Sequence, residues 1–173
     1  MQNSKSQIAT PTIKRRLISM VYEAFLLTAV EALAILLYLF ATRNQHTPTI
    51  DHGRNFVFFL VAAAYFIHAW SGSGHTLAMK TWRIKVVKLG YRTVPLRAAA
   101  VRYLMAWGWF LPAIVACYVF GWKSTGQVGA AIAVGIVAWA MTALFDKDRQ
   151  FLHDKVAGTR LISLPKPVKA PKA

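Results

Sequence analysis

The sequence predicts an all-α membrane protein with four transmembrane helices, both termini in the cytoplasm, and a small cytoplasmic β-hairpin between helices 2 and 3. Of its 173 residues, 56% are hydrophobic, and they gather in four long blocks rather than in an amphipathic pattern. About 20 apolar helical residues cross a hydrocarbon core of about 30 Å. The expected spans are residues 17–41, 55–72, 98–121 and 127–145.

The distribution of basic residues predicts the orientation of these spans. Lysines and arginines total 18 before the first span, between the second and third, and after the fourth, against three in the two remaining connections. Cytoplasmic connections are enriched in these residues. We therefore expect a multi-pass membrane protein with both termini in the cytoplasm.

The first span begins after two arginines and contains two acids, Glu23 and Glu31. We expect this block to stay as a helix, because it is too long and too acidic for a signal peptide. An ionisable side chain within a spanning helix is costly to bury and indicates a functional site by default. Residues 1–13 before it are polar and are predicted to be disordered.

The connection between the second and third spans is predicted to form the hairpin. Trp82, Ile84 and Val86 alternate with Arg83, Lys85 and Val87, a period of two that is typical of a half-buried strand. Gly90 then allows a turn, and Tyr91–Pro95 would return as the second strand. An interfacial helix with basic side chains reaching the phosphates is the alternative. Arg160–Leu164 is a further extended segment that would join the hairpin.

The last two spans have different characters. Pro112 is expected to kink the third, because proline removes a backbone hydrogen bond. Small residues such as Gly129 and Gly135 predict that the fourth packs closely against another helix. The membrane domain is expected to occupy residues 14–162, followed by a basic proline-lysine tail, 163–173, with a weak affinity for membranes.

The net charge of +15 is explained by this topology and by attraction to the bilayer's anionic lipid head groups, so we expect no nucleic-acid partner. Cys117 is the only cysteine, which excludes an intramolecular disulfide and cysteine-based zinc sites. Ser71, Ser73 and His75 lack a nucleophile-elbow pattern, and the five histidines lack metalloprotease spacing. We expect no enzymatic activity, no metal and no cofactor.

Three segments carry short motifs, in order between about Arg15 and Ile162. Arg15–Glu23 is an Arg-Arg-Leu stretch with an acid about two turns on, Gly74–Val87 is similar to Gly-Gln-Thr-x-Gly-Met/Lys with a following strand, and Arg149–Arg160 is similar to His-Asp-x-x-Ala-Gly-Thr. Together they resemble the RDD family of bacterial membrane proteins, which implies a protein of the bacterial inner (cytoplasmic) membrane. The supporting residues are Arg15, Gly74, Thr76, Lys80, Arg149, His153, Gly158 and Thr159.

The resemblance implies three charged family positions, at Arg16 (with Arg15 as the near alternative), Glu23 and Asp154. Glu23 stands where the family has aspartate, so the charge is kept and one methylene is added. Sodium/proton exchange and other transport roles have been proposed for some family members.

These residues allow two interpretations. In the first, Arg16 forms a salt bridge with Asp154 that ties the two ends of the fold together, and Glu23 is satisfied by an arginine or by hydroxyls and indoles. In the second, Glu23 binds a cation or a proton in a cytoplasmic vestibule, on a pathway that includes Glu31 and His68. Histidine changes charge near neutral pH, although a packing role for His68 is the competing interpretation.

Two functions follow from these interpretations. One is a small transporter or cation/proton exchanger, expected to be oligomeric because four helices leave little room for an isolated pathway. The alternative is a non-transporting scaffold or assembly partner whose basic cytoplasmic face binds lipid. The expected partners are a second copy of the chain or another membrane protein.

Overall fold

The protein is mostly helical and has a small two-stranded sheet. The structure, a computed structural model, describes residues 9–165. The outer parts of the two predicted tails, residues 1–8 and 166–173, lie outside the described residues. The elements in order are α1 (Ile13–Ala41), α2 (Pro48–Gly72), α3 (Leu77–Thr81), β1 (Ile84–Val87), α4 (Leu96–Ala106), η1 (Trp107–Trp109), α5 (Leu111–Phe120), α6 (Thr125–Met141), η2 (Thr142–Leu144), α7 (Leu152–Val156) and β2 (Arg160–Ser163).

The long helices begin at hydroxyl caps supplied by the preceding residue. Thr47 accepts a hydrogen bond from the Ile50 amide at 3.3 Å, and Pro48 occupies the first turn, where a missing N–H costs nothing. Ser124 accepts from the Gln127 amide at 3.3 Å in the same way. The cap at Thr47 starts α2 seven residues before the predicted span, within the polar connection.

Three helical segments are each long and apolar enough to cross a membrane: α1, α2, and α6 together with η2. The pair α4–η1 and α5 makes a fourth if it is taken as one span, with a bend of 40° between its halves. Pro112 lies in the first turn of α5, directly after this bend. The predicted kink is therefore confirmed beside Pro112, which cannot donate the backbone hydrogen bond that one continuous helix would need at this position.

The sheet pairs β1 with β2, antiparallel, with Ile84 opposite Ser163. The predicted β-hairpin between helices 2 and 3 is wrong, because Tyr91–Pro95 is not a strand, whereas the suggestion that Arg160–Leu164 joins the sheet is confirmed. Leu161 is 4% exposed and extends the core formed by β1, where Ile84 is 1% exposed. Burial of this apolar face favours β2 over the proline-containing segment.

The side chain of Gln150 holds β2 along its second edge. It accepts a hydrogen bond from the Leu161 amide at 2.9 Å and donates to the Leu161 carbonyl at 3.4 Å. On the other side of the sheet, the Val86 amide donates to the carbonyl of Gly74 at 2.6 Å. The backbone groups at both edges of this short sheet are thus partly satisfied without further strands.

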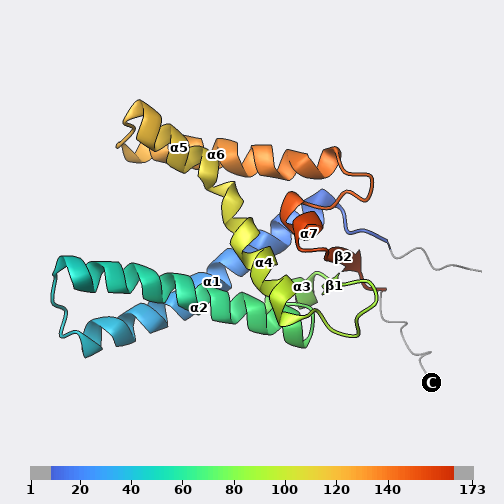
Figure 1. The fold of residues 1–173 in the computed structure, drawn as a ribbon, viewed down its shortest axis with the longest axis horizontal. Coiled ribbons are helices and arrows are strands. Elements are labelled where there is room, and N and C mark those ends of the chain that lie inside the picture. Colours follow the sequence, from blue (N-terminus) through green and yellow to red (C-terminus); the bar gives the residue numbers. More distant parts are fainter. Residues whose placement is uncertain (1–8, 166–173) are drawn as a thin grey trace, which may run out of the picture.

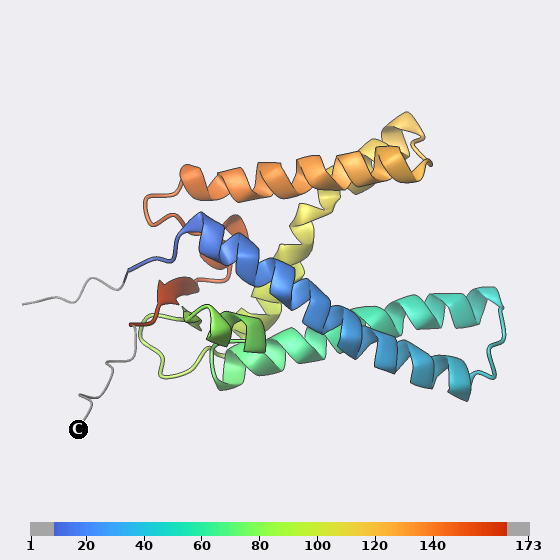
Figure 2. The same cartoon turned by 180° about the vertical axis from the view of Figure 1, so that it is seen from behind.

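The helices form two hairpins joined by α4 (Figure 1). One hairpin is α1–α2 and the other is α5–α6, and α4 crosses between them. Both hairpin loops, residues 42–47 and 121–124, lie at one end of the molecule, and the sheet and α7 lie at the opposite end. Figure 2 shows the same division from behind, with α1 in front of α4. The two hairpin loops, which carry few basic residues, thus lie at the end of the molecule opposite the sheet and α7, near which the basic residues are more numerous (Figure 1).

Large apolar side chains remain exposed along the hairpins. Phe25, Phe40 and Tyr118 are 74%, 85% and 91% exposed. Soluble monomers rarely leave apolar surface of this extent uncovered. The buried apolar residues instead gather around the sheet and α4, where Ala99 and Phe151 are fully buried. This is the end of the molecule that carries the charged motif residues.

Candidate functional site

Charged and polar side chains from α1, α4 and α7 meet in the interior, at the end of the hairpins that carries the sheet. This buried charge cluster consists of Arg16, Glu23, Arg102, His153 and Asp154, none more than 8% exposed. An uncompensated buried charge is strongly unfavourable, so the partners of each group decide what the cluster can do.

Asp154 forms an ion pair with Arg102 of α4. The Phe151 amide also donates to its second carboxylate oxygen at 3.3 Å, as at a helix N-terminus. Arg102 in turn donates to the Thr159 hydroxyl at 3.3 Å, and its guanidinium lies 4.7 Å from the centre of the Trp70 ring. The C-terminal motif is thus joined to the helix at the centre of the fold.

The predicted salt bridge between Arg16 and Asp154 is wrong, because Arg102 is the cation that reaches Asp154. Arg16 donates through Nε to the Pro11 carbonyl at 3.0 Å, and its guanidinium lies 5.1 Å from the centre of the Phe151 ring. Its two terminal nitrogens make no hydrogen bond within residues 9–165. Contact between α4 and α7 decides the pairing, which the sequence could not show.

Arg15 has a different environment from Arg16. Its side chain donates to the Ser163 hydroxyl at 2.8 Å and to the backbone carbonyl of Trp82. It therefore joins the start of α1 to β2 and to the segment that precedes β1. Of the two adjacent arginines, Arg16 is the one in the buried charge cluster.

Glu23 is held by two neutral hydroxyl groups. Tyr65 of α2 donates to one carboxylate oxygen at 2.5 Å, and Thr76 donates to the other. Thr76 also accepts a hydrogen bond from the Met79 amide at 3.2 Å and so caps α3. The acid therefore connects α1 with α2 and with the turn before α3.

Glu31 lies two turns deeper in α1 and is only 3% exposed. In the described part of the chain, neither of its carboxylate oxygens makes a hydrogen bond. His68 is exposed on α2, and no hydrogen bond joins its imidazole to Glu23 or Glu31 among the described residues. Glu23 and Glu31 are thus both buried side chains of α1, whereas His68 is exposed on α2 and does not contact them through a hydrogen bond in the described residues.

His153 is neutral and has a defined tautomer. Trp139 donates its indole N–H to Nδ1 at 3.1 Å, and Nε2 lies 3.7 Å from a carboxylate oxygen of Asp154. Burial lowers the pKa of His153 well below its ordinary value, and the positive charges of Arg102 and Arg16 lower it further. Since Nδ1 accepts, the proton is on Nε2 and faces the carboxylate.

The remaining motif residues shape the backbone around the cluster. Gly74 has a positive φ of 80°, and a Cβ there would lie 2.7 Å from the Val86 carbonyl. Gly158 ends α7 at a φ of 63°, and Thr159 donates to the Asp154 carbonyl at 3.2 Å. Lys80 and Arg149 are exposed. Sequence reasoning missed Arg102 and Tyr65, whose roles have no local signal.

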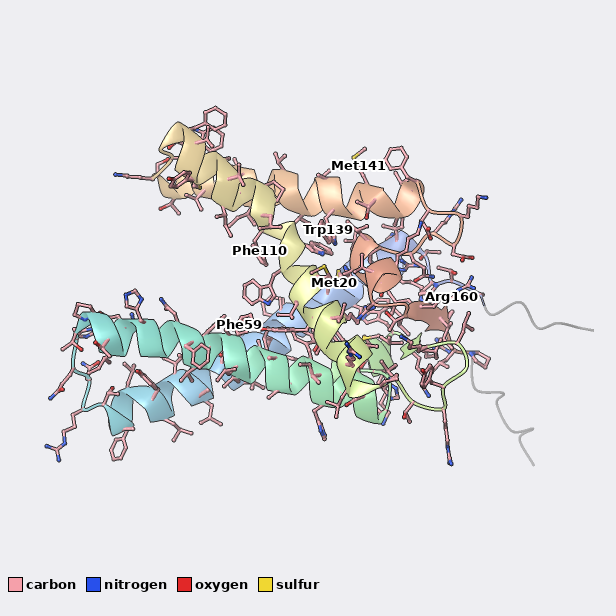
Figure 3. All side chains as sticks on the ribbon, in the orientation of Figure 1. Met20, Phe59, Phe110, Trp139, Met141 and Arg160 are labelled. Carbon is pink, nitrogen blue, oxygen red and sulfur yellow. The ribbon has the colours of Figure 1, made fainter. Side chains whose placement is uncertain are left out.

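A cavity of about 440 Å³ lies between the two hairpins. Arg16, Glu23, Arg102 and His153 contribute to its wall, and most of the other lining residues are apolar. Figure 3 shows Phe110 and Trp139 on the side of the upper hairpin that faces α4, and Phe59 on the facing side of α2. This interhelical cavity connects the buried charge cluster with the apolar middle of the fold.

Comparison with known proteins agrees with this arrangement. The sequence profile of the RDD family matches residues 10–158, which include all three charged motif positions. No curated protein and no solved structure gives a significant match to the chain. Since the match covers most of the chain and the helices are apolar enough to span a membrane, the chain belongs to the RDD family of membrane proteins.

Proposed function

We propose that this protein is a small transporter of the bacterial inner membrane that exchanges a cation for a proton at Glu23. It crosses the membrane four times, with both termini in the cytoplasm. The asymmetric distribution of basic residues supports this orientation, as does the grouping of the two hairpin loops at one end of the molecule (Figure 1).

The observation that carries the proposal is the environment of Glu23. Glu23 is one of the residues that line the interhelical cavity, and its carboxylate is held by hydroxyl groups, not by an arginine. Neutral donors leave the negative charge uncompensated, so a cation or a proton is needed to balance it. An acid already neutralised by an arginine would have no such capacity.

Protonation of Glu23 has a structural consequence. The ionised carboxylate accepts hydrogen bonds from Tyr65 and Thr76, which lie on α2 and before α3. A protonated carboxyl group becomes a donor at one oxygen, so one of these hydrogen bonds must either reverse, with the hydroxyl accepting, or break. Exchange at Glu23 thereby alters the attachment of α1 to its neighbours, as alternating access requires.

Glu31 is the second residue that binds the ion or proton on the proposed pathway. It lies about 12 Å further along α1, at about 1.5 Å per residue, and is buried without a hydrogen-bond donor in the described chain. The cavity wall extends along α1 only to Leu27, one turn short of Glu31. Transport therefore requires movement of α1 against α2 to open the path.

Flux into reconstituted vesicles tests the proposal. Sodium, potassium and proton gradients are imposed on vesicles that contain the wild-type protein, Glu23→Gln or Glu31→Gln. Asp148→Asn is the matched control, because Asp148 is an acid on the exposed surface that pairs only with Arg160 in the described structure. We expect flux from wild type and control and its loss in both glutamine variants.

Absence of flux from the wild-type protein under all three gradients would exclude exchange of these ions. Equal flux from all four proteins would show that transport does not depend on Glu23 or Glu31. In the first case the scaffold hypothesis, with its basic lipid-binding face, becomes the better explanation.

A further inference from the structure

The interhelical cavity has a mostly apolar wall, and it is also lined by Arg16, whose terminal nitrogens have no hydrogen-bond partner in the described residues. Arg16 is 2% exposed and lines the cavity, and its Nη1 and Nη2 make no hydrogen bond to any residue from 9 to 165. Buried polar groups are normally satisfied, because desolvation without a partner costs free energy. Both nitrogens are buried in this structure, so the Arg16 guanidinium must turn toward the cavity to bind an acceptor there.

The acids nearby in the described residues are bonded to other groups and do not pair with the terminal nitrogens of Arg16. Asp154 is paired with Arg102, and Glu23 is occupied by two hydroxyl groups. His153 accepts from Trp139 through Nδ1 and carries no positive or negative charge. A planar guanidinium fork matches the oxygens of a phosphate or a carboxylate. The missing partner is thus an anion with oxygen acceptors.

The rest of the cavity favours hydrocarbon over water. At about 30 Å³ per molecule, a volume of 440 Å³ corresponds to about 15 waters. Side chains such as Met20, Leu27, Phe66 and Ile136 form its wall and offer water no hydrogen bonds. An apolar chain is the better occupant of such a space.

The length and the opening of the cavity match one leaflet of a bilayer. Along α1 its wall runs from Arg16 to Leu27, about 16 Å at 1.5 Å per residue, against about 15 Å for half a hydrocarbon core. Phe58 and Phe110 line the cavity and are 43% and 38% exposed. Both lie near the middle of helical segments that are long and apolar enough to cross a membrane, so the cavity opens on an apolar surface suited to lipid.

We propose that the interhelical cavity binds one anionic phospholipid, whose phosphate accepts hydrogen bonds from Arg16 and whose acyl chain lies along α1 toward Leu27. This site goes beyond ion exchange and does not depend on it. Lipid binding is expected even if the vesicles show no flux, and flux at Glu23 can occur without it.

Native mass spectrometry of the detergent-purified protein tests the site. The probes are phosphatidylglycerol, zwitterionic phosphatidylcholine, and glycerol 3-phosphate, which has the phosphate without acyl chains. We expect one phosphatidylglycerol to be retained per chain, phosphatidylcholine to be retained less, and glycerol 3-phosphate neither to bind nor to compete.

Two pairs of variants identify the location. Arg16→Gln is expected to weaken phosphatidylglycerol retention by about tenfold, because it removes a charge-assisted bidentate contact. Arg97→Gln, which removes an exposed positive charge from α4, is the control. Ala106→Phe fills the cavity without altering a charge and should also weaken retention, whereas Ala29→Phe, on the exposed side of α1, should not.

The proposal is overturned if wild type retains no phosphatidylglycerol, or if Arg16→Gln and Arg97→Gln lower retention equally. Unchanged retention by Ala106→Phe would place the lipid elsewhere. Competition by glycerol 3-phosphate would instead indicate a site for a soluble phosphate compound. If Arg16→Gln does not fold, the comparison of Ala106→Phe with Ala29→Phe decides alone.

Discussion

Asp154 and Arg102 form an ion pair in the interior, 0% and 4% exposed, that joins the C-terminal motif to the central helix α4. Buried pairs of this kind contribute little relative to apolar residues, but the loss of one partner leaves an uncompensated charge. The pair therefore holds α7 in one position on α4, with Thr159 as a further contact.

The first prediction concerns this pair. Arg102→Ala and Asp154→Asn are each expected to lower the free energy of unfolding by about 3–5 kcal/mol, and the double variant by much less than the sum. Denaturant unfolding in detergent measures the coupling. The matched cycle of Arg16→Ala with Asp154→Asn should be close to additive, since no ion pair joins those residues in the described structure. Stronger coupling to Arg16 would contradict the observed pairing.

The second prediction concerns the donors to Glu23. Tyr65→Phe removes one hydroxyl from a buried carboxylate and is expected to lower stability by about 1–3 kcal/mol. Thr76→Val should have a similar effect. Tyr22→Phe is the control, because Tyr22 is 52% exposed and its ring contact with Trp82 survives the change. Melting temperatures in detergent compare the variants, and equal losses for Tyr65→Phe and Tyr22→Phe would count against the hydrogen bond.

The third prediction concerns pH. The folded-state pKa of His153 is lowered, so the unfolded chain binds a proton at higher pH than the folded protein does. Stability from this group is therefore complete above the unfolded pKa of about 6.5 and decreases as pH falls below it, by at most about 1.4 kcal/mol per pH unit. The free energy of unfolding, measured between pH 7.5 and 5, should show this decrease.

His153→Asn tests the origin of this pH dependence. Asparagine can still accept from the Trp139 indole but does not titrate, so the decrease between pH 6.5 and 5 should become smaller. Asp146 also has a lowered pKa, chiefly because the Gln150 amide donates to it, but its contribution is lost only below about pH 4. An unchanged profile in His153→Asn would assign the dependence to another group.

The fourth prediction concerns the contact between α6 and η1. A Cβ at Gly135 would collide with the Trp109 carbonyl, whereas one at Gly129 would meet nothing within 4 Å. Gly135→Ala is expected to destabilise the protein by about 1–3 kcal/mol through overpacking. Gly129→Ala should be neutral or stabilising, because alanine favours helix more than glycine does. Thermal unfolding of both variants in detergent measures the difference, and similar results would argue against this helix contact.

In the sheet, local sequence patterns predict one strand but not the strand with which it pairs. Alternation over residues 82–87 predicts a strand, because side chains on alternate positions face opposite sides, and β1 is found there. The choice of its partner was not local. Tyr91–Pro95 is adjacent in sequence, but β2 supplies Leu161 to the core and is held by Gln150, which precedes α7.

The sequence by itself determined the apolar segments, their order, the bend at Pro112 and the family. These follow from hydropathy, the distribution of charge and short motifs, which are properties of neighbouring residues. Only the tertiary structure decided that Arg102 pairs with Asp154 and that Tyr65 and Thr76 hold Glu23. It also decided that, within residues 9–165, the terminal nitrogens of Arg16 make no hydrogen bond. The chain carries 21 lysines and arginines with similar chemistry, and the packing of helices distant in sequence selects which of them reaches each acid.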